Sequence, residues 1–420
     1  MSVAAQQQGA NAPGERAGTG QTDPGSGRKP HIAFVVNTLT PYRVQSHLRV
    51  RREIPEFDVR TYVHWDMGQN LWVYDDVPEI GVVSFPGVAS EKQMGTLDYY
   101  RREWRTGGLI IKRMIADPPA AILVCGYATP STFRVIRWAS GRIPLMIWGD
   151  SNIHGDTVTG YRRFIKDRLV RWAVSKADAI MPCGVNGKKF FARYGCPPEK
   201  MFAFPVEPDY GMIENCPRAT INAARERWKI DAARKRLLIC GRFIAVKGID
   251  VGIDAFVAIA DRRPDWDLFI IGDGPLRKFL EARVPERLRH RVTFAGFIDK
   301  QDVVNAIYHQ CEVLVHPSNK DAWGVVLLEA SAAGLAIVTT PVVGASPEFV
   351  ADHASGRLFP PGDRKALTDA LMDVTDPANT TRFKLASKAL SDRFRRDFDP
   401  VMKMKRALKY IGVATKETGA

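Results

Sequence analysis

Residues 313–334 read VLVHPSNKDAWGVVLLEASAAG and predict a strand, a loop and a helix in that order. The run 313–315 is apolar and rich in valine, as a short buried strand is. A Pro-Ser-Asn loop ends it at 317–319, and an apolar helix is expected to begin at Gly324. Apolar strands that alternate with helices are typical of parallel sheets covered on both faces.

The same alternation extends along the whole chain. In the first half we predict strands at 31–37, 58–63, 82–85, 121–125, 145–148, 179–182 and 202–204. In the second half we predict strands at 236–241, 267–271, 292–295, 313–315, 336–340 and 357–359, with helices at 250–260, 324–333 and 364–373. Two such blocks indicate two doubly wound α/β domains.

The 420 residues are too many for one small domain. We predict a disordered tail at 1–30, a first domain at 31–205, a second domain at 206–380, and a helical segment at 381–420 that packs back toward the first domain. The boundary is placed where FPVEPDY (204–210) interrupts the pattern. Because such folds bind ligands at the carboxyl ends of their strands, the site is expected between the domains.

Composition favours a cytoplasmic globular protein. The chain is 45% apolar but contains no apolar run of the roughly 18 residues that a bilayer span requires. Residues 1–30 lack the apolar segment of a signal peptide. The six cysteines are scattered and form no CxxC pair, so we expect reduced thiols rather than disulfides or metal ligands.

Positive charge is concentrated in the first half. Residues 31–205 hold 24 Lys and Arg against 16 Asp and Glu, whereas residues 206–400 hold 28 against 27. Residues 162–172 form a basic amphipathic pattern, which fits either a solvated helix face or a surface that docks to anionic lipid or to a lipid-diphosphate acceptor. No recognition motif accompanies the charge, so nucleic acid is not expected as a partner.

Asp321 and Glu329 are the first candidate site residues. They stand eight positions apart around the expected helix start. Two carboxylates beside a helix N-terminus suit a ligand with both phosphate and sugar hydroxyls. An ordinary strand–loop–helix unit with solvated acids is the alternative.

Further candidates follow other strands of the second domain. GRFIAVKG (241–248) places Arg242 and Lys247 between glycines, where they can grip a diphosphate or remain solvated cations. Gly272 and Gly274 form a tight turn, and Phe297 stands in a similar one. Either turn can be purely structural or can line a ligand. Glu348 could cap the helix that follows it.

Five segments in order, GRFIAVKG, IIGDGP, VTFAGF, HPSNKDAWGVVLLEASAAGLAIVTT and GASPEFV, resemble the nucleotide-sugar domain of family 4 retaining glycosyltransferases. The resemblance covers residues 236–373 and, less strongly, residues 31–205. It implies the GT-B fold, in which two Rossmann-like domains face a cleft and a C-terminal helix crosses back to the first domain.

The resemblance also implies roles by position. Arg242 and Lys247 match a cationic pair on the donor diphosphate. Asp321 and Glu329 match a pair of glutamates that contact the transferred sugar and the ribose, although Asp321 is one methylene shorter. Trp323 and Gly324 lie in a loop whose backbone N–H groups meet the donor, and Gly272, Gly274 and Phe297 are expected to line the donor side.

In the first domain, TLTPYR (38–43) replaces a loop that is often glycine-rich in the family. Arg43 and Tyr42 are expected on the acceptor side, unless Pro41 merely fixes a surface turn. The family often has a histidine, thought to assist catalysis at the donor sugar, where this chain has Asp150. Asp150, Ser151, Asn152 and His154 are the candidates to replace it.

The resemblance implies a retaining transferase that uses a UDP- or GDP-sugar, with no metal and no other cofactor. A glycan or lipid-linked acceptor, bacterial-type polysaccharide or glycolipid synthesis, and peripheral contact with the anionic inner face of the plasma membrane are expected. Two alternatives stay open: another GT-B enzyme, such as an epimerase or phosphorylase, and a non-catalytic nucleotide-sugar-binding protein.

Overall fold

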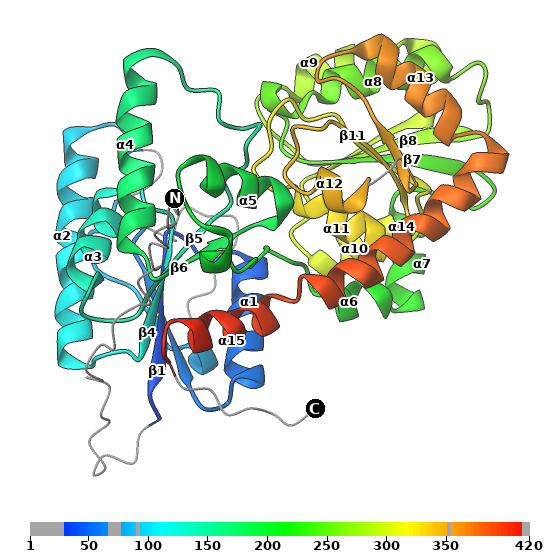
Figure 1. Cartoon of the computed structure of the whole chain (residues 1–420). Coiled ribbons are helices and arrows are strands. Elements are labelled where there is room, and N and C mark those ends of the chain that lie inside the picture. Colours follow the sequence, from blue (N-terminus) through cyan, green and yellow to red (C-terminus); the bar gives the residue numbers. More distant parts are fainter. Residues whose placement is uncertain (1–28, 66–76, 90–92, 351–353, 414–420) are drawn as a thin grey trace, which may run out of the picture.

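The protein folds into two α/β domains, each built on a six-stranded parallel sheet (Figure 1). The computed structural model describes residues 29–65, 77–89, 93–350 and 354–413. The predicted tail at 1–30 therefore lies almost wholly outside the described residues. The strands of the first sheet are β1 His31–Val36, β2 Asp58–Val63, β3 Val82–Val83, β4 Ala121–Cys125, β5 Leu145–Gly149 and β6 Ala179–Pro182. Those of the second are β7 Lys235–Cys240, β8 Trp266–Ile271, β9 Val292–Gly296, β10 Val313–His316, β11 Ala336–Thr339 and β12 Gly356–Leu358.

Both sheets have the strand order of a Rossmann fold. The first runs β3-β2-β1-β4-β5-β6. The second runs β12-β11-β10-β7-β8-β9, which is the same order read from the opposite edge. The predicted fold class is confirmed. The chain reverses its direction across the sheet between β1 and β4 in one domain and between β7 and β10 in the other.

Helices cover both faces of each sheet because the strands are apolar on both sides. In the first domain they are α1 Pro41–Glu53, α2 Leu97–Ala116, α3 Pro130–Ala139, α4 Gly160–Lys176 and α5 Gly184–Arg193. In the second they are α6 Tyr210–Glu214, α7 Arg218–Arg227, α8 Ile249–Ile259, α9 Arg277–Ala282, α10 Gln301–Tyr308, α11 Val325–Ala332, α12 Ser346–Phe349 and α13 Arg364–Val374. The chain ends with α14 Pro377–Asp397 and α15 Pro400–Tyr410.

One expected strand does not form. Residues 202–204 run beside β6 and make two backbone bonds to it, Phe202 N to Ile180 O and Phe204 N to Pro182 O. The ladder stays incomplete because Pro182 of β6 has no N–H to donate to Phe202 O, and Phe204 O accepts from the Trp148 indole instead.

The C-terminal helices cross from the second domain to the first, as the fold class predicts (Figure 1). Helix α14 packs on α11, whereas α15 packs on α1. Arg49 of α1 lies at this crossing, where its guanidinium donates to Asp399 Oδ2 at 2.6 Å and also pairs with the buried Glu207. One hydrophobic core consequently continues from the α1 side of the first sheet to the α10–α11 side of the second.

No helix in the described part of the chain is both long enough and apolar enough to cross a membrane.

Candidate active site

The loops that leave the two switch points carry most of the candidate residues. Strands β7 and β10 are neighbours, so the loops GRFIAVKG and HPSNKD leave the same edge of the second sheet side by side. Asn319 N donates to Val246 O at 2.8 Å and ties the two loops together. The strand order reverses between β7 and β10, and open α/β sheets bind their ligands at such a point.

Lys247 and Asp321, predicted separately, are in direct contact. Lys247 Nζ lies 2.7 Å from Asp321 Oδ2, and His316 Nε2 donates to the same oxygen at 2.9 Å. Burial opposes ionisation of Asp321, but the hydrogen bond from His316 and the charges of His316 and Lys247 hold its pKa well below the usual range. Asp321 is therefore a fixed carboxylate at neutral pH. His316 was not a predicted site residue, although it stands in the stretch quoted first.

Glu329 lies inside α11 and is buried. Its carboxylate accepts hydrogen bonds from Tyr308 OH at 2.9 Å, Gln301 Nε2 at 3.0 Å and Tyr42 OH at 2.9 Å. Burial raises the pKa of Glu329, and the three hydrogen bonds oppose this rise. Tyr42 comes from the first domain, so the two domains meet at this carboxylate.

Arg43 and Asp150 stand at the facing edge of the first sheet. Arg43 Nη1 donates to Thr38 O at 2.7 Å, and its guanidinium lies over the Trp148 ring at 5.5 Å from the centroid. Asp150 is exposed on one side, but the protein around its carboxyl displaces water and raises its pKa. The charge of Arg43 opposes this rise, and the charge of Asp321 adds to it. His154 is exposed further along the same loop.

The two glycines of the GDGP turn are needed for a close backbone approach. A Cβ at Gly272 would lie 1.9 Å from Gly241 O, and one at Gly274 would lie 2.8 Å from Phe243 O. They thus hold the GRFIAVKG loop in place, whatever they contact in a ligand. Arg242 and Phe297 are exposed at the same strand edge.

Asn152 ties the two strand edges to each other. Its buried Nδ2 donates to Asp321 O at 2.8 Å and to Ala322 O at 2.9 Å, while its Oδ1 accepts from Gly155 N. Of the four candidates between residues 150 and 154, Asn152 is the one that contacts the Asp321 loop. It positions the backbone rather than a reacting group.

The side chain of Trp323 lies in the domain junction. Its Nε1 donates to Val206 O at 2.8 Å in the linker, and its ring packs near Phe394 of α14. Only its backbone therefore remains available for the predicted donor loop, together with that of Gly324, the N-cap of α11.

Glu348 does not cap the helix that follows it: it lies inside α12 and caps a helix of the other domain. Its Oε1 accepts from Val185 N at 2.6 Å, in the first turn of α5. A Cβ at Gly184 would lie 2.3 Å from that oxygen, so a glycine is required there. Burial raises the pKa of Glu348 to about 7.

The buried Glu348 predicts a pH-dependent stability. Between the ordinary glutamate pKa of 4.5 and about 7, the folded protein keeps this proton while the unfolded chain loses it, so stability falls as pH rises. Glu348→Gln keeps an acceptor for Val185 but carries no charge. We expect its stability relative to wild type to increase by as much as about 3 kcal/mol between pH 4.5 and pH 8, measured by denaturant unfolding.

Glu199→Gln, at an exposed position, is the matched control and should follow wild type across this range. A constant difference between Glu348→Gln and wild type would contradict the buried-carboxylate interpretation.

No group of three or more His, Cys, Asp or Glu that could hold a metal ion occurs among the described residues.

Comparison with known proteins connects this geometry to an activity. Residues 220–389 match the family model described as glycosyl transferases group 1. Glycogen synthase of Mycobacterium tuberculosis is 27% identical over 73% of this chain and 68% of that protein. The lipopolysaccharide glucosyltransferase WaaG of Escherichia coli is 31% identical over 40% of this chain and 45% of that protein. The chain is a glycosyltransferase with the GT-B fold.

The glycosyltransferase also resembles solved structures over most of its length. HepE of Anabaena, in complex with UDP and glucose, superposes with a TM-score of 0.66. The likeness covers 92% of this chain and 100% of that chain at 18% sequence identity. At this identity the likeness establishes the fold alone.

Proposed function

We propose that this glycosyltransferase is a family 4 enzyme that transfers a sugar from a nucleotide-sugar donor to an acceptor hydroxyl with retention of anomeric configuration. The observation that carries the proposal is the contact between Lys247 and Asp321 at the switch point of the second sheet. A fixed cation beside a fixed carboxylate suits a ligand that has a diphosphate next to sugar hydroxyls.

The donor would bind along the second sheet edge. Lys247 and the exposed Arg242 supply positive charge for the diphosphate, and the N-terminus of α11 adds backbone N–H groups. Both contacts to Asp321 go to Oδ2, so Oδ1 is the oxygen that would face the sugar hydroxyls. Glu329 would take the ribose after Tyr42 moves away from it. We propose UDP or GDP as the nucleotide, without a metal or other cofactor.

The reaction would proceed on one face of the sugar. The bond from the anomeric carbon to the diphosphate oxygen breaks, and a bond from the acceptor oxygen forms on the same side. The acceptor proton passes to the departing phosphate, whose charge Lys247 and Arg242 stabilise. No protein nucleophile is assigned. Asp150 and Arg43 face this region from the first domain and would meet the acceptor.

The acceptor that we propose is a lipid-linked glycan in polysaccharide or glycolipid synthesis. The relative WaaG is named for lipopolysaccharide, and α4 carries six Lys and Arg against one acid. We place the enzyme at the cytoplasmic face of the plasma membrane, which fits its six free cysteines. Nucleic acid is not proposed as a partner.

A thermal-shift screen against UDP-, GDP- and ADP-sugars tests the donor. We expect one nucleotide class to stabilise the protein by about 2.7 kcal/mol at a concentration 100 times its Kd. The matching sugar should then pass, as a radiolabel, to a lipid-linked acceptor. Release of nucleotide without transfer would count against the transferase, and no stabilisation by any nucleotide sugar would count against the donor site.

A further inference from the structure

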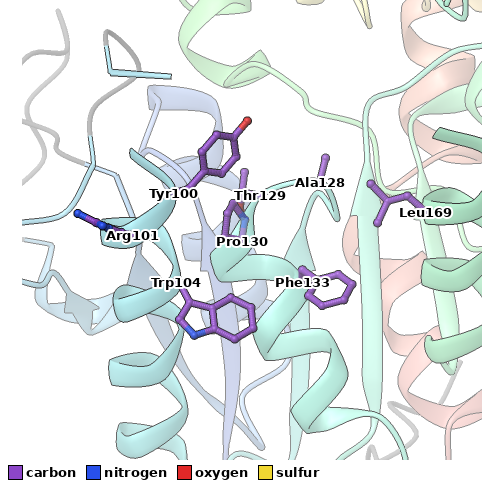
Figure 2. Close-up of a pocket in the computed structure, with 8 residues that line it drawn as sticks. All are labelled: Tyr100, Arg101, Trp104, Ala128, Thr129, Pro130, Phe133 and Leu169. Carbon is purple, nitrogen blue, oxygen red and sulfur yellow. The ribbon is translucent and has the colours of Figure 1, made fainter. Parts of the chain in front are cut away.

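The first domain has an apolar groove on its outer helical face, lined by residues that are not part of the candidate active site. The groove lies between α2, the start of α3 and α4, and has a volume of about 590 Å³. This is within the range of roughly 300–1000 Å³ that is common for ligand sites. Figure 2 shows the residues that line it, which include Tyr100, Arg101, Trp104, Pro130, Phe133 and Leu169.

The walls of the groove are held in place by contacts between the three helices. Phe133 of α3 stacks on Trp172 of α4 with ring centroids 4.4 Å apart. Arg134 of α3 donates to Trp104 O of α2 at 2.7 Å, and its guanidinium lies over the Trp104 ring. The groove is therefore part of the packed fold.

Large apolar side chains are also exposed on the helices that border the groove. On α2, Leu97, Tyr100 and Trp104 follow the helical repeat and are 66%, 51% and 46% exposed. On α4, Tyr161, Phe164 and Ile165 are between 59% and 72% exposed. Single exposed apolar residues are ordinary, but a concentration on the helices that border one groove marks an interaction surface.

The same helices are strongly basic. Lys and Arg outnumber acids by five to two in α2, by two to none in α3 and by six to one in α4. One of the two acids of α2, Glu103, is buried. Arg101 lines the groove itself, and aromatic walls on helices of net positive charge match an anionic lipid, whose hydrocarbon chain needs an apolar site and whose headgroup needs positive charge.

We propose that this groove binds one hydrocarbon chain of an anionic membrane lipid and so seats the first domain on the membrane. The inference rests on the proposed function in one respect: a lipid-linked acceptor would be presented at this side of the enzyme. Helices α2 and α3 begin at the carboxyl edge of the first sheet, so the groove lies toward the edge that carries Arg43 and Asp150. The position lets a lipid stay in the bilayer while its glycan reaches the reacting groups.

The test uses the full chain and two kinds of vesicle, phosphatidylcholine alone and equal parts of phosphatidylcholine and phosphatidylglycerol. We expect co-sedimentation with the anionic vesicles only. Trp104→Glu should weaken this binding about tenfold or more, because an apolar anchor is replaced by a charge. Tyr100→Glu is a second, independent variant. Leu385→Glu, at a 70% exposed position on α14, is the matched control and should bind as wild type does.

Lipids with brominated chains locate the contact. They should quench part of the fluorescence of the nine tryptophans, and Trp104→Phe should remove most of that quenching while binding persists. Absence of binding by wild type, equal binding to neutral vesicles, or binding by both glutamate variants as strong as wild type would overturn the proposal. So would a wild-type dimer that Trp104→Glu separates, since the groove would then take a second copy of the chain.

Donor binding distinguishes this proposal from the proposed function. Trp104→Glu should keep its unfolding temperature and its stabilisation by the nucleotide sugar. Vesicle binding by a protein that no nucleotide sugar stabilises would leave the groove standing and remove the donor site. Donor binding by a protein that does not bind vesicles would remove the lipid groove and leave the donor site standing.

Discussion

Lys247→Ala is expected to lower kcat about 100- to 1000-fold, the loss typical when one group that stabilises developing charge is removed. The ammonium lies 2.7 Å from Asp321 Oδ2, where a donor diphosphate beside the sugar would meet it. Asp321 would keep its bond from His316, so the carboxylate should remain in place. The measurement is the initial rate of transfer at saturating donor, together with the unfolding temperature.

Lys320→Ala is the matched control, because Lys320 is an exposed lysine beside Asp321 and should leave kcat unchanged. Lys247→Arg should recover only part of the rate, since a planar guanidinium does not replace a compact ammonium. If Lys247→Ala kept the wild-type kcat, Lys247 would have no part in the reaction. Its contact with Asp321 would then no longer support a donor site.

Glu329→Gln is expected to raise the donor Kd about 10- to 100-fold. A hydrogen bond to a charged acceptor contributes about 1.5–3 kcal/mol, and the ribose would lose that charge. The substitution also disturbs the acceptor of Tyr42, Tyr308 and Gln301, so the unfolding temperature should fall as well. Isothermal calorimetry with the stabilising nucleotide sugar measures the affinity.

Tyr42→Phe separates the expected effect of Glu329 on donor affinity from its effect on stability. It removes the bond from the first domain but leaves the carboxylate, so donor affinity should not decrease although the unfolding temperature does. If Glu329→Gln bound the donor as tightly as wild type and only lost stability, Glu329 would be a structural residue of the junction. Glycan production in cells that carry Glu329→Ala would then also continue.

The sequence predicted the fold because its signals are local. Short apolar strands, alternating with helices along the chain, require buried parallel sheets, and eleven of the thirteen expected strand positions differ from β1–β12 by no more than one residue at either end. The segment 82–85 is shortened to Val82–Val83, and residues 202–204 pair with β6 only in part because Pro182 has no N–H to complete the ladder. The turns at glycines and the order of the motifs could likewise be identified without the tertiary structure.

Lys247 and Asp321 were identified separately from the sequence, but their contact depends on β7 and β10 lying side by side. Tyr42, Asn152 and Glu329 were candidates as well, but nothing in the sequence indicated their contacts across the junction. Tyr42 and Glu329 are 287 positions apart, and Asn152 and Asp321 are 169 apart. A polar residue that bonds to the other domain leaves no periodic pattern in its own segment.

The sequence by itself determined two Rossmann-like domains and the residues that leave their switch points, because hydrophobic periodicity and turn chemistry act over a few residues. Only the tertiary structure decided that Glu329 is held by Tyr42, that Trp323 points into the junction, and that Glu348 caps α5. These contacts arise where two separately folded strand edges meet, and their partners are set by domain packing rather than by neighbours in the chain.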